Sequence, residues 1–229
     1  MSVLPDTDSS RARDGSIKEQ LYQSLKADIV NGTFDMGERL NEAQLSAKYG
    51  VSRAPLRQVL TLLQRDELVE VVPRVGYLTS RLTLQDVNDI FDLRLLVEAA
   101  TVQKAASQIT DADLDRLARL CSKYHPGDHE SYRLHLDENL EFHRTIAEAA
   151  GNRRMAQVLT QSMEHMVRLI VLRLDMSSAD VVVAEHLEIA GALRQRDADL
   201  ARELMVHHLA VARQATVEAI MRLTANRHL

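Results

Sequence analysis

One stretch, Leu40–Leu60, constrains the fold of this chain more than any other part of the sequence. It predicts two short helices joined at Gly50, because glycine permits the left-handed backbone of a sharp helix-to-helix turn. Ser52 is a suitable N-cap for the second helix, and Pro55 falls in its first turn, where proline's missing N–H costs nothing. The apolar residues of this helix follow a helical period, and they are Leu56, Val59, Leu60 and Leu63. The stretch is therefore a helix-turn-helix with one inward face.

Two arginines, Arg53 and Arg57, lie one turn apart at the start of the second helix, off its apolar face. Arginines on a helix are usually no more than a solvated face, so the flanking sequence must decide their role. Strands are predicted over residues 68–72 and 77–79, and the turn Pro73–Gly76 between them makes a hairpin wing. A β-ribbon of this kind lies along a DNA backbone or enters a minor groove. Together the two helices, the arginines and the wing predict double-stranded DNA as a partner.

The apolar pattern divides the chain into three segments. Residues 1–15 are polar without periodicity and are predicted to be a disordered arm. Residues 16–80 form the predicted winged helix-turn-helix DNA-binding domain, and residues 83–226 carry a helical pattern throughout. The low aromatic content, 3%, with only 8 glycines and 4 prolines, favours helices over a large sheet. The predicted fold class is mostly α, with a C-terminal all-α bundle of about six helices.

The charge distribution bears on how DNA is bound. The net charge is −5, yet residues 52–65 hold three arginines and no acid, so the positive potential is local to one helix. One copy makes few phosphate contacts and binds weakly, which favours a homodimer on a two-fold DNA site. A single cysteine, Cys121, argues against a disulfide framework. With no long apolar run and no signal peptide, the chain is predicted to be cytoplasmic.

The first helix of the bundle is predicted over residues 83–108. Its predicted inward residues are Val87, Ile90, Leu93, Leu96 and Val97. On three later helices a histidine interrupts the apolar stripe: His143, His186 and His208. One such histidine is usually a hydrogen-bonded core imidazole, but three on separate helices of one bundle could share a divalent ion. Asn139, one turn before His143, could add an amide oxygen. On the residues alone, the metal site and the purely structural role both stay open.

Several segments resemble a known family. Those that resemble the N-terminal domain of GntR-type bacterial transcription regulators are Val51-Ser-Arg-Ala-Pro-Leu-Arg57, Leu68-Val-Glu and Pro73-Arg-Val-Gly76. Those that resemble the FCD effector domain of the FadR subfamily are Leu93-Arg-Leu-Leu-Val-Glu98, Asn139-Leu-Glu-Phe-His143, Ala149-Ala-Gly-Asn152, Glu185-His186 and His207-His208-Leu209. The resemblance covers nearly all of the chain.

The resemblance implies roles for individual residues at the DNA. Arg53 and Arg57 match positions that reach the major groove, and Ser52 matches one that contacts phosphate or base. Gly76, with Arg74 nearby, matches the tip of the wing. Where some relatives carry a DNA-contacting arginine, this chain has Ala43, so one contact is expected to be missing.

In many FCD domains three histidines and a carboxylate bind a divalent ion, here expected to be Zn²⁺, Ni²⁺ or Mn²⁺. The matching positions are His143, His186, His208 and Asn139. Asn139 stands where the family usually has aspartate, so the site lacks one negative charge and metal affinity should fall.

The resemblance also implies a small effector, usually an organic acid held at the metal. Arg94 matches a position that reaches an effector carboxylate, although a surface salt bridge with Glu98 at i+4 is the simpler interpretation. Arg168 and Arg173 are weaker candidates on a helix expected to line the same cavity. The resemblance thus implies a homodimeric transcriptional regulator switched by a carboxylate at a metal site; a repressor is expected, and activation stays open as the alternative.

The sequence leaves two alternatives open. In the first, the histidines are structural and a metal-free cavity binds a different effector, such as an acyl thioester. In the second, the bundle is a metal-dependent enzyme attached to a DNA-binding domain. The sequence shows no evident Glu or Asp general base next to the three histidines, which argues against the enzyme.

Overall fold

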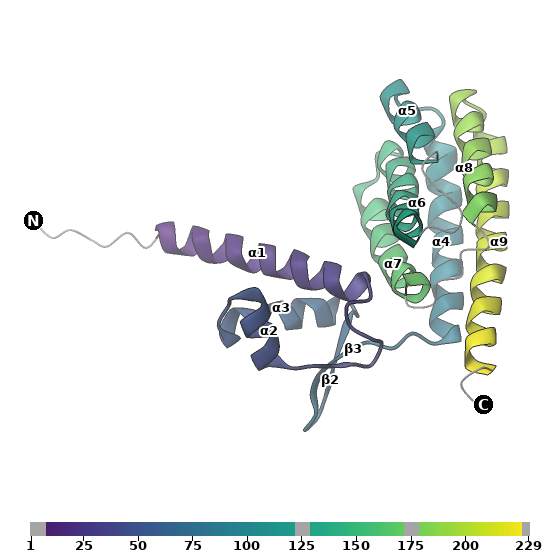
Figure 1. The fold of residues 1–229 in the computed structure, drawn as a ribbon. Helices are drawn as coiled ribbons and strands as arrows, with labels where there is room; N and C mark the ends of the chain where they lie inside the picture. The colour runs from purple at the N-terminus through teal and green to yellow at the C-terminus, as the bar shows by residue number, and fades with distance from the viewer. Residues whose placement is uncertain (1–7, 122–128, 172–178, 226–229) are drawn as a thin grey trace, which may run out of the picture. The chain divides into compact units, whose positions relative to one another are not determined.

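The computed structural model describes residues 8–121, 129–171 and 179–225 (Figure 1). The chain forms two compact units, residues 1–81 and residues 82–229. The mostly helical fold class predicted from the sequence is confirmed, with a winged helix-turn-helix in the first unit and a helical bundle in the second. No helix within the described ranges is long and apolar enough to span a membrane.

The N-terminal unit combines three helices with a small sheet. Its elements are α1 (Asp8–Val30), β1 (Arg39–Leu40), α2 (Glu42–Tyr49), α3 (Arg53–Arg65), β2 (Val69–Val72) and β3 (Gly76–Thr79). The strands are antiparallel in the order β1-β3-β2, and Val72 pairs with Gly76 at the closed end of the wing. Gly76 has φ 108, a backbone conformation that side chains other than glycine rarely adopt. The hairpin turn therefore depends on this glycine.

The helix-turn-helix has the local chemistry expected from its sequence. Gly50 ends α2 with φ 66, as a left-handed turn requires. Asn41 caps α2, and its Oδ1 accepts hydrogen bonds from two backbone amides in the first turn. The predicted inward residues of α3 are all 0% exposed, and they are Leu56, Val59, Leu60 and Leu63. Ser52 occupies the N-cap position of α3 but makes no side-chain cap hydrogen bond.

Two features of this unit differ from the sequence prediction. Helix α1 begins at Asp8, so part of the segment predicted to be a disordered arm is helical, while residues 1–7 lie outside the described residues. Apolar periodicity missed these turns because their sequence carries no apolar period, while a helix already nucleated can extend by one backbone hydrogen bond per residue. Strand β1 was missed because two residues carry no period.

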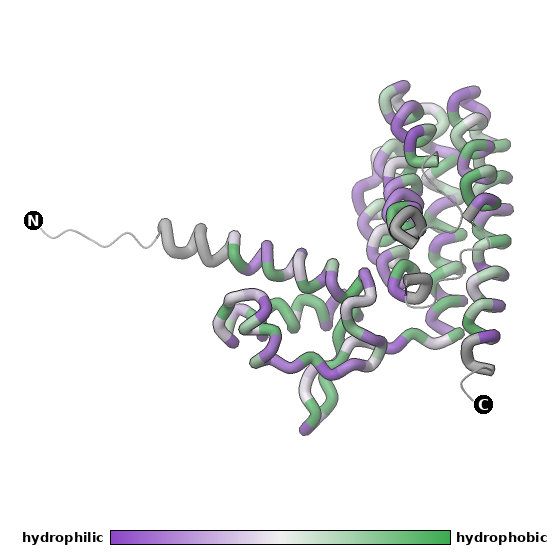
Figure 2. The backbone as a smooth tube through the Cα atoms, viewed as in Figure 1, coloured by the Kyte–Doolittle hydropathy of each residue, from purple (hydrophilic) through white to green (hydrophobic). Residues whose placement is uncertain are grey.

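The C-terminal unit is a bundle in which α4 is surrounded by other helices. Its elements are α4 (Leu84–Ala105), α5 (Asp111–Leu120), α6 (His129–Ala149), α7 (Arg153–Val171), α8 (Ala179–Arg194) and α9 (Ala198–Ala225). Helix α4 packs against α6, α7 and α9, and α9 packs also against α8 (Figure 1). Figure 2 shows hydrophobic segments distributed along these helices. Their buried residues form a large cluster that includes Ile146 and Leu193, and a separate smaller cluster that includes Leu159 and Met163.

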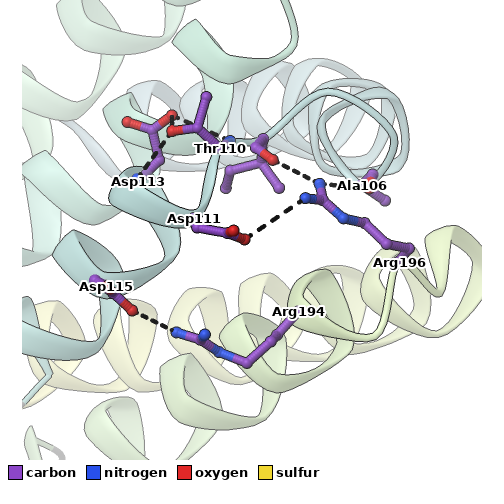
Figure 3. Close-up of polar contacts among 8 residues, drawn as sticks. Ala106, Thr110, Asp111, Asp113, Asp115, Arg194 and Arg196 are labelled. Atoms are coloured by element: carbon purple, nitrogen blue, oxygen red, sulfur yellow. Dashed lines mark hydrogen bonds and ion pairs between the residues drawn. The ribbon is translucent and has the colours of Figure 1, made fainter.

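Polar caps define both ends of α4. Thr83 and Asp86 form a capping box at its N-terminus. Just beyond its C-terminus, the guanidinium of Arg196 donates hydrogen bonds to the carbonyl oxygens of Ala106 at 3.2 Å and Ile109 at 2.6 Å (Figure 3). Ala106 is the C-cap residue of α4 and Ile109 lies in the connection to α5, and both are buried, so Arg196 satisfies carbonyl groups that burial would otherwise penalise.

A second arginine ties the other half of α4 to α9. Arg213 of α9 donates from Nε to Asn88 at 3.0 Å and from Nη1 to Asp92 at 2.7 Å. Both ends of the α4–α9 contact are therefore held by polar bonds as well as by packing.

The face of α4 that lies inside differs from the prediction. Leu93 and Leu96, predicted to be inward, are 37% and 74% exposed. Arg94 and Glu98 lie inside instead, at 5% and 1% exposed, alongside Phe91. Periodicity counts apolar residues, whereas here a pair of opposite charges is buried because each partner satisfies the other. The prediction that Leu93 and Leu96 lie in the core is therefore wrong, because it did not allow for a buried ion pair.

Candidate functional site

A groove of about 220 Å³ opens between the N-termini of α2 and α3, strand β1 and the wing. Three of its lining residues are arginines: Arg39, Arg53 and Arg57. Gly76 and Tyr77 contribute from the wing. Arg39 escaped prediction because it sits in a strand too short to show a pattern. A groove lined by several cations beside the start of α3 is suited to a polyanion.

The DNA-contacting residues implied by the resemblance are distributed around this groove. Arg53, Arg57 and Gly76 line it directly. Ser52 and Arg74 are exposed but are not among its lining residues. Arg74 adopts φ 67 in the wing turn, which directs the backbone into the hairpin.

One arginine of the groove is paired with an acid. Arg57 Nε lies 2.7 Å from Glu42 Oε2, and its Nη2 lies 3.4 Å from Glu42 Oε1. The hydrogen bond and the charge of Glu42 raise the pKa of Arg57. The Arg57 side chain is 61% exposed and that of Glu42 is 26% exposed. The pair therefore faces solvent on the same surface as the groove.

The second site lies in the core of the bundle. His143 on α6, His186 on α8 and His208 on α9 are each 3% exposed or less. One ring nitrogen from each lies within 4.8 Å of those of the other two. The three histidines singled out from the sequence are thus brought together from separate helices. Imidazole nitrogens gathered in this way are the ligands that Zn²⁺, Ni²⁺ and related ions prefer.

Two glutamates contact the outer nitrogens of this cluster. The carboxylate of Glu98 contacts His143 Nδ1, and Glu185 Oε2 lies 2.7 Å from His208 Nδ1. A carboxylate at Nδ1 holds the proton on that atom and leaves Nε2 with a free lone pair, as metal-binding histidines require. The sequence shows no evident general base next to the histidines, and it did not predict these two carboxylates, which contact the rings at Nδ1. Each glutamate acts from the side of the ring that faces away from Nε2.

The third histidine is held by stacking. The ring of His186 lies parallel to that of Phe142, with centroids 3.9 Å apart and planes 4° apart. His186 Nε2 is buried and has no hydrogen-bond partner within the described residues. A buried ring nitrogen without a partner is costly unless something else binds it. The buried lone pair of His186 Nε2 would be satisfied by a metal ion, so the cluster fits such an ion.

Burial favours the neutral form of two of these imidazoles, His143 and His186. It lowers the pKa of His143 to about 4, although Glu98 acts in the opposite direction. Burial and the neighbouring His208 lower the pKa of His186 well below its ordinary value. Neutral imidazole is the form that coordinates metal, so the ring nitrogens need not first lose a proton near neutral pH.

A buried ion pair adjoins the cluster. Arg94 Nε lies 2.6 Å from Glu98 Oε1, and Arg94 Nη2 lies 3.4 Å from His143 Nε2. Burial alone would raise the pKa of Glu98, but Arg94 and His143 lower it to about 2. The salt bridge between Arg94 and Glu98 exists, but it is internal and not on the surface. It places one fixed cation beside the histidines.

The remaining predicted residues have different placements. Asn139 is half-buried on α6, one turn before His143, and its role as a ligand stays a prediction. Arg168 is 1% exposed, and burial lowers its pKa to about 10. Arg173 lies outside the described residues. Glu185 and Phe142 were missed, although both adjoin a predicted ligand in the sequence.

Family models match both units of the chain. Residues 17–78 match bacterial regulatory proteins of the gntR family, and residues 89–211 match the FCD domain. The chain belongs to the GntR family of transcriptional regulators with an FCD domain. This family membership identifies a DNA-binding regulator and not an enzyme.

Known relatives agree with this assignment. The chain is 32% identical over 200 residues to the HTH-type transcriptional repressor GlaR of Escherichia coli, covering 82% of this chain and 90% of GlaR. It is 29% identical over 195 residues to the uncharacterized HTH-type transcriptional regulator YdhC of Bacillus subtilis, covering 82% and 86% of the two chains. The solved structure of E. coli McbR/YncC has the same fold, with a TM-score of 0.77 at 19% identity over 88% of this chain and 97% of that one.

Proposed function

We propose that this regulator is a homodimeric repressor whose binding to operator DNA is switched by an anionic ligand at a metal ion held by His143, His186 and His208. The observation that carries the proposal is the gathering of three buried ring nitrogens within 4.8 Å of one another. Asn139 is the proposed fourth ligand. A bound divalent ion supplies positive charge that anchors an anion inside the bundle.

The charges around the cluster favour a carboxylate ligand. Glu98 and Glu185 bring two negative charges and Arg94 one positive charge, while Asn139 brings none. A divalent ion in this setting keeps one uncompensated positive charge, which a monoanion neutralises. Arg94, beside His143 Nε2, is placed to contact that anion. Arg168 and Arg173 are further candidates for this contact.

At the other unit, the proposed DNA contacts are Ser52, Arg53, Arg57, Arg74 and Gly76. The exposed cationic groove beside α3 supports these assignments. The printed name of GlaR, a repressor, supports repression over activation. Exposed Leu93 and Leu96 on α4 support pairing with a second copy, since an apolar helix face is stabilised by being covered.

The proposed switch uses α4, the helix that follows the wing in the chain. Arg94 and Glu98 connect α4 to His143, so a ligand that draws on Arg94 changes the forces on this helix. An allosteric coupling of about 1–3 kcal/mol changes DNA affinity roughly 5- to 150-fold.

The metal is tested on protein purified without a His-tag. We expect about one divalent ion per chain by elemental analysis, and a higher melting temperature on adding Zn²⁺, Ni²⁺ or Mn²⁺. Carboxylates should raise it further, and neutral sugars should not. No bound metal and no shift with any of the three ions would end the metal proposal.

A metal-free regulator is the second candidate, and one contact favours it. Arg94 Nη2 already lies 3.4 Å from His143 Nε2, where it satisfies that nitrogen without an ion. Under this alternative the histidines are structural and the cavity binds a different effector. The same elemental analysis separates the two candidates, because only the first requires an ion in the purified protein.

A further inference from the structure

The ion pair between Arg57 and Glu42 occupies only one of the two hydrogen-bonding edges of the guanidinium. Glu42 receives hydrogen bonds from Nε at 2.7 Å and from Nη2 at 3.4 Å, which together form the side edge. Guanidinium carries five N–H donors in a rigid fork, so Nη1 and the second hydrogen of Nη2 remain available. These donors form the end edge, which is suited to the O6 and N7 acceptors of guanine in the major groove.

Glu42 is itself held in place. It is the first residue of α2, and the Asn41 side chain caps that helix by accepting from the amides of Ala43 and Gln44. Its side chain is less than half as exposed as that of Arg57, at 26% against 61%. The cap fixes the helical backbone on which Glu42 stands, and the Glu42 side chain is the less exposed member of the pair, so it limits the directions that the Arg57 side chain can take.

We propose that Glu42 is a positioning residue that aims the end edge of Arg57 at a guanine and thereby sets base selectivity. This rests on the proposed role of Arg57 as a base-contacting residue. Exposed ion pairs contribute little to stability, so the pair is not needed to hold the fold. A carboxylate near DNA phosphates also repels them, so Glu42 lowers affinity for DNA of any sequence while raising discrimination.

The neighbouring arginine shows the contrast. Arg53 lines the same groove but forms no ion pair among the residues that the structure describes. No carboxylate among those residues therefore fixes the direction of its guanidinium, which suits contact with phosphate oxygens. Under this proposal Arg57, which is paired, selects a base, and Arg53 attaches the protein to the DNA backbone.

The test compares full-length variants on two DNA probes. The first probe is a duplex selected by the wild-type protein from a random library, with single base-pair replacements at each guanine. The second is calf-thymus DNA, which measures binding without sequence preference. The variants are Glu42→Gln, Arg57→Ala and the double variant. The matched control is Glu70→Gln, which removes an exposed carboxylate on β2 that has no ion pair in the described part of the chain.

We expect Glu42→Gln to bind calf-thymus DNA as well as wild type or several-fold more tightly. Its discrimination at one guanine per half-site should fall roughly 10-fold, within the range of a bidentate arginine–guanine contact. In the Arg57→Ala background the same substitution should leave discrimination unchanged. Glu70→Gln should keep the wild-type discrimination, and all variants should melt near the wild-type temperature.

Three results would overturn the proposal: full discrimination in Glu42→Gln, an equal loss in Glu70→Gln, or an undiminished effect of Glu42→Gln without Arg57. Failure of the underlying function looks different. If Arg57→Ala alone keeps full guanine discrimination, then Arg57 does not read a base, and its proposed role fails together with that of Glu42.

Discussion

The two units each place an arginine against a glutamate at nearly the same distance, in opposite surroundings. Arg57 Nε lies 2.7 Å from Glu42 and Arg94 Nε lies 2.6 Å from Glu98. The first pair is 61% and 26% exposed, and the second is 5% and 2% exposed. Water screens the first pair, so it contributes little to the stability of the fold. The second is a fixed charge arrangement that its neighbours must balance.

The same substitution in the two pairs should therefore have very different effects on stability. Glu98→Gln leaves Arg94 buried without a counter-charge, and we expect it to lower the free energy of unfolding by about 3–5 kcal/mol. Glu42→Gln should lower it by less than about 1 kcal/mol. Urea denaturation of both variants measures this. Equal losses would show that burial does not separate the pairs.

Removing a histidine should abolish stabilisation by metal. At a free ion concentration of 100 Kd, we expect wild type to gain about 2.7 kcal/mol and His186→Ala to gain almost nothing. The control is His207→Ala, since that side chain is 68% exposed. Calorimetric melting with and without Zn²⁺ or Ni²⁺ provides the comparison. A metal response that survives in His186→Ala would place the ion elsewhere.

Acid should weaken the metal-free bundle gradually. The pKa of His143 is about 4 when folded and 6.5 in the unfolded chain, so below pH 6.5 protons bind the unfolded state preferentially. Stability is therefore complete above about pH 6.5 and falls toward pH 4. Glu98, with a folded pKa of about 2 against 4.5, extends the loss as the pH falls below 4.5. Hydrogen exchange in EDTA, followed separately for each unit, measures the effect. A bundle equally stable at pH 7 and pH 5 would contradict it.

The smallest effect is expected from restoring a cation to the DNA-binding surface. Ala43 lines the groove beside Arg53 and Arg57, so Ala43→Arg should add about one phosphate contact. We expect a several-fold gain in affinity and a salt dependence steeper by about one ion. Ala47→Arg, on the same helix but not in the groove, adds the same charge as a control. Equal gains in both variants would show that only net charge matters.

How far the sequence predicted each unit depends on the range of the interactions involved. The helix-turn-helix followed from neighbours in the chain, because the Gly50 turn, the helix caps and the apolar period of α3 are all local. The three histidines were found because each interrupts a local stripe.

The surroundings of the histidines could not be found in this way. Arg94 and Glu98 form a local pair, but their burial depends on His143, which lies on another helix. Glu185 was visible only as a neighbour of His186 and in the structure serves His208 instead. Phe142 resembled an ordinary core residue until the fold stacked His186 upon it. Charge placement inside a bundle is a property of helix packing, which no single periodic pattern contains.

The hydrogen bonds from Arg196 to the carbonyls of Ala106 and Ile109 restrain the C-terminal end of α4, so a movement of this helix is expected to be smallest there. Arg196 lies just before α9, so the same hydrogen bonds join the start of α9 to the end of α4. Arg213 of α9 bonds to Asn88 near the other end of α4, so the two helices are expected to move together. At 1.5 Å per residue, Glu98 lies about 12 Å from the pivot and Leu84 about 33 Å. For a rigid helix turning about this point, a displacement of about 1 Å at Glu98 becomes nearly 3 Å at Leu84, the end of α4 that follows the wing in the chain.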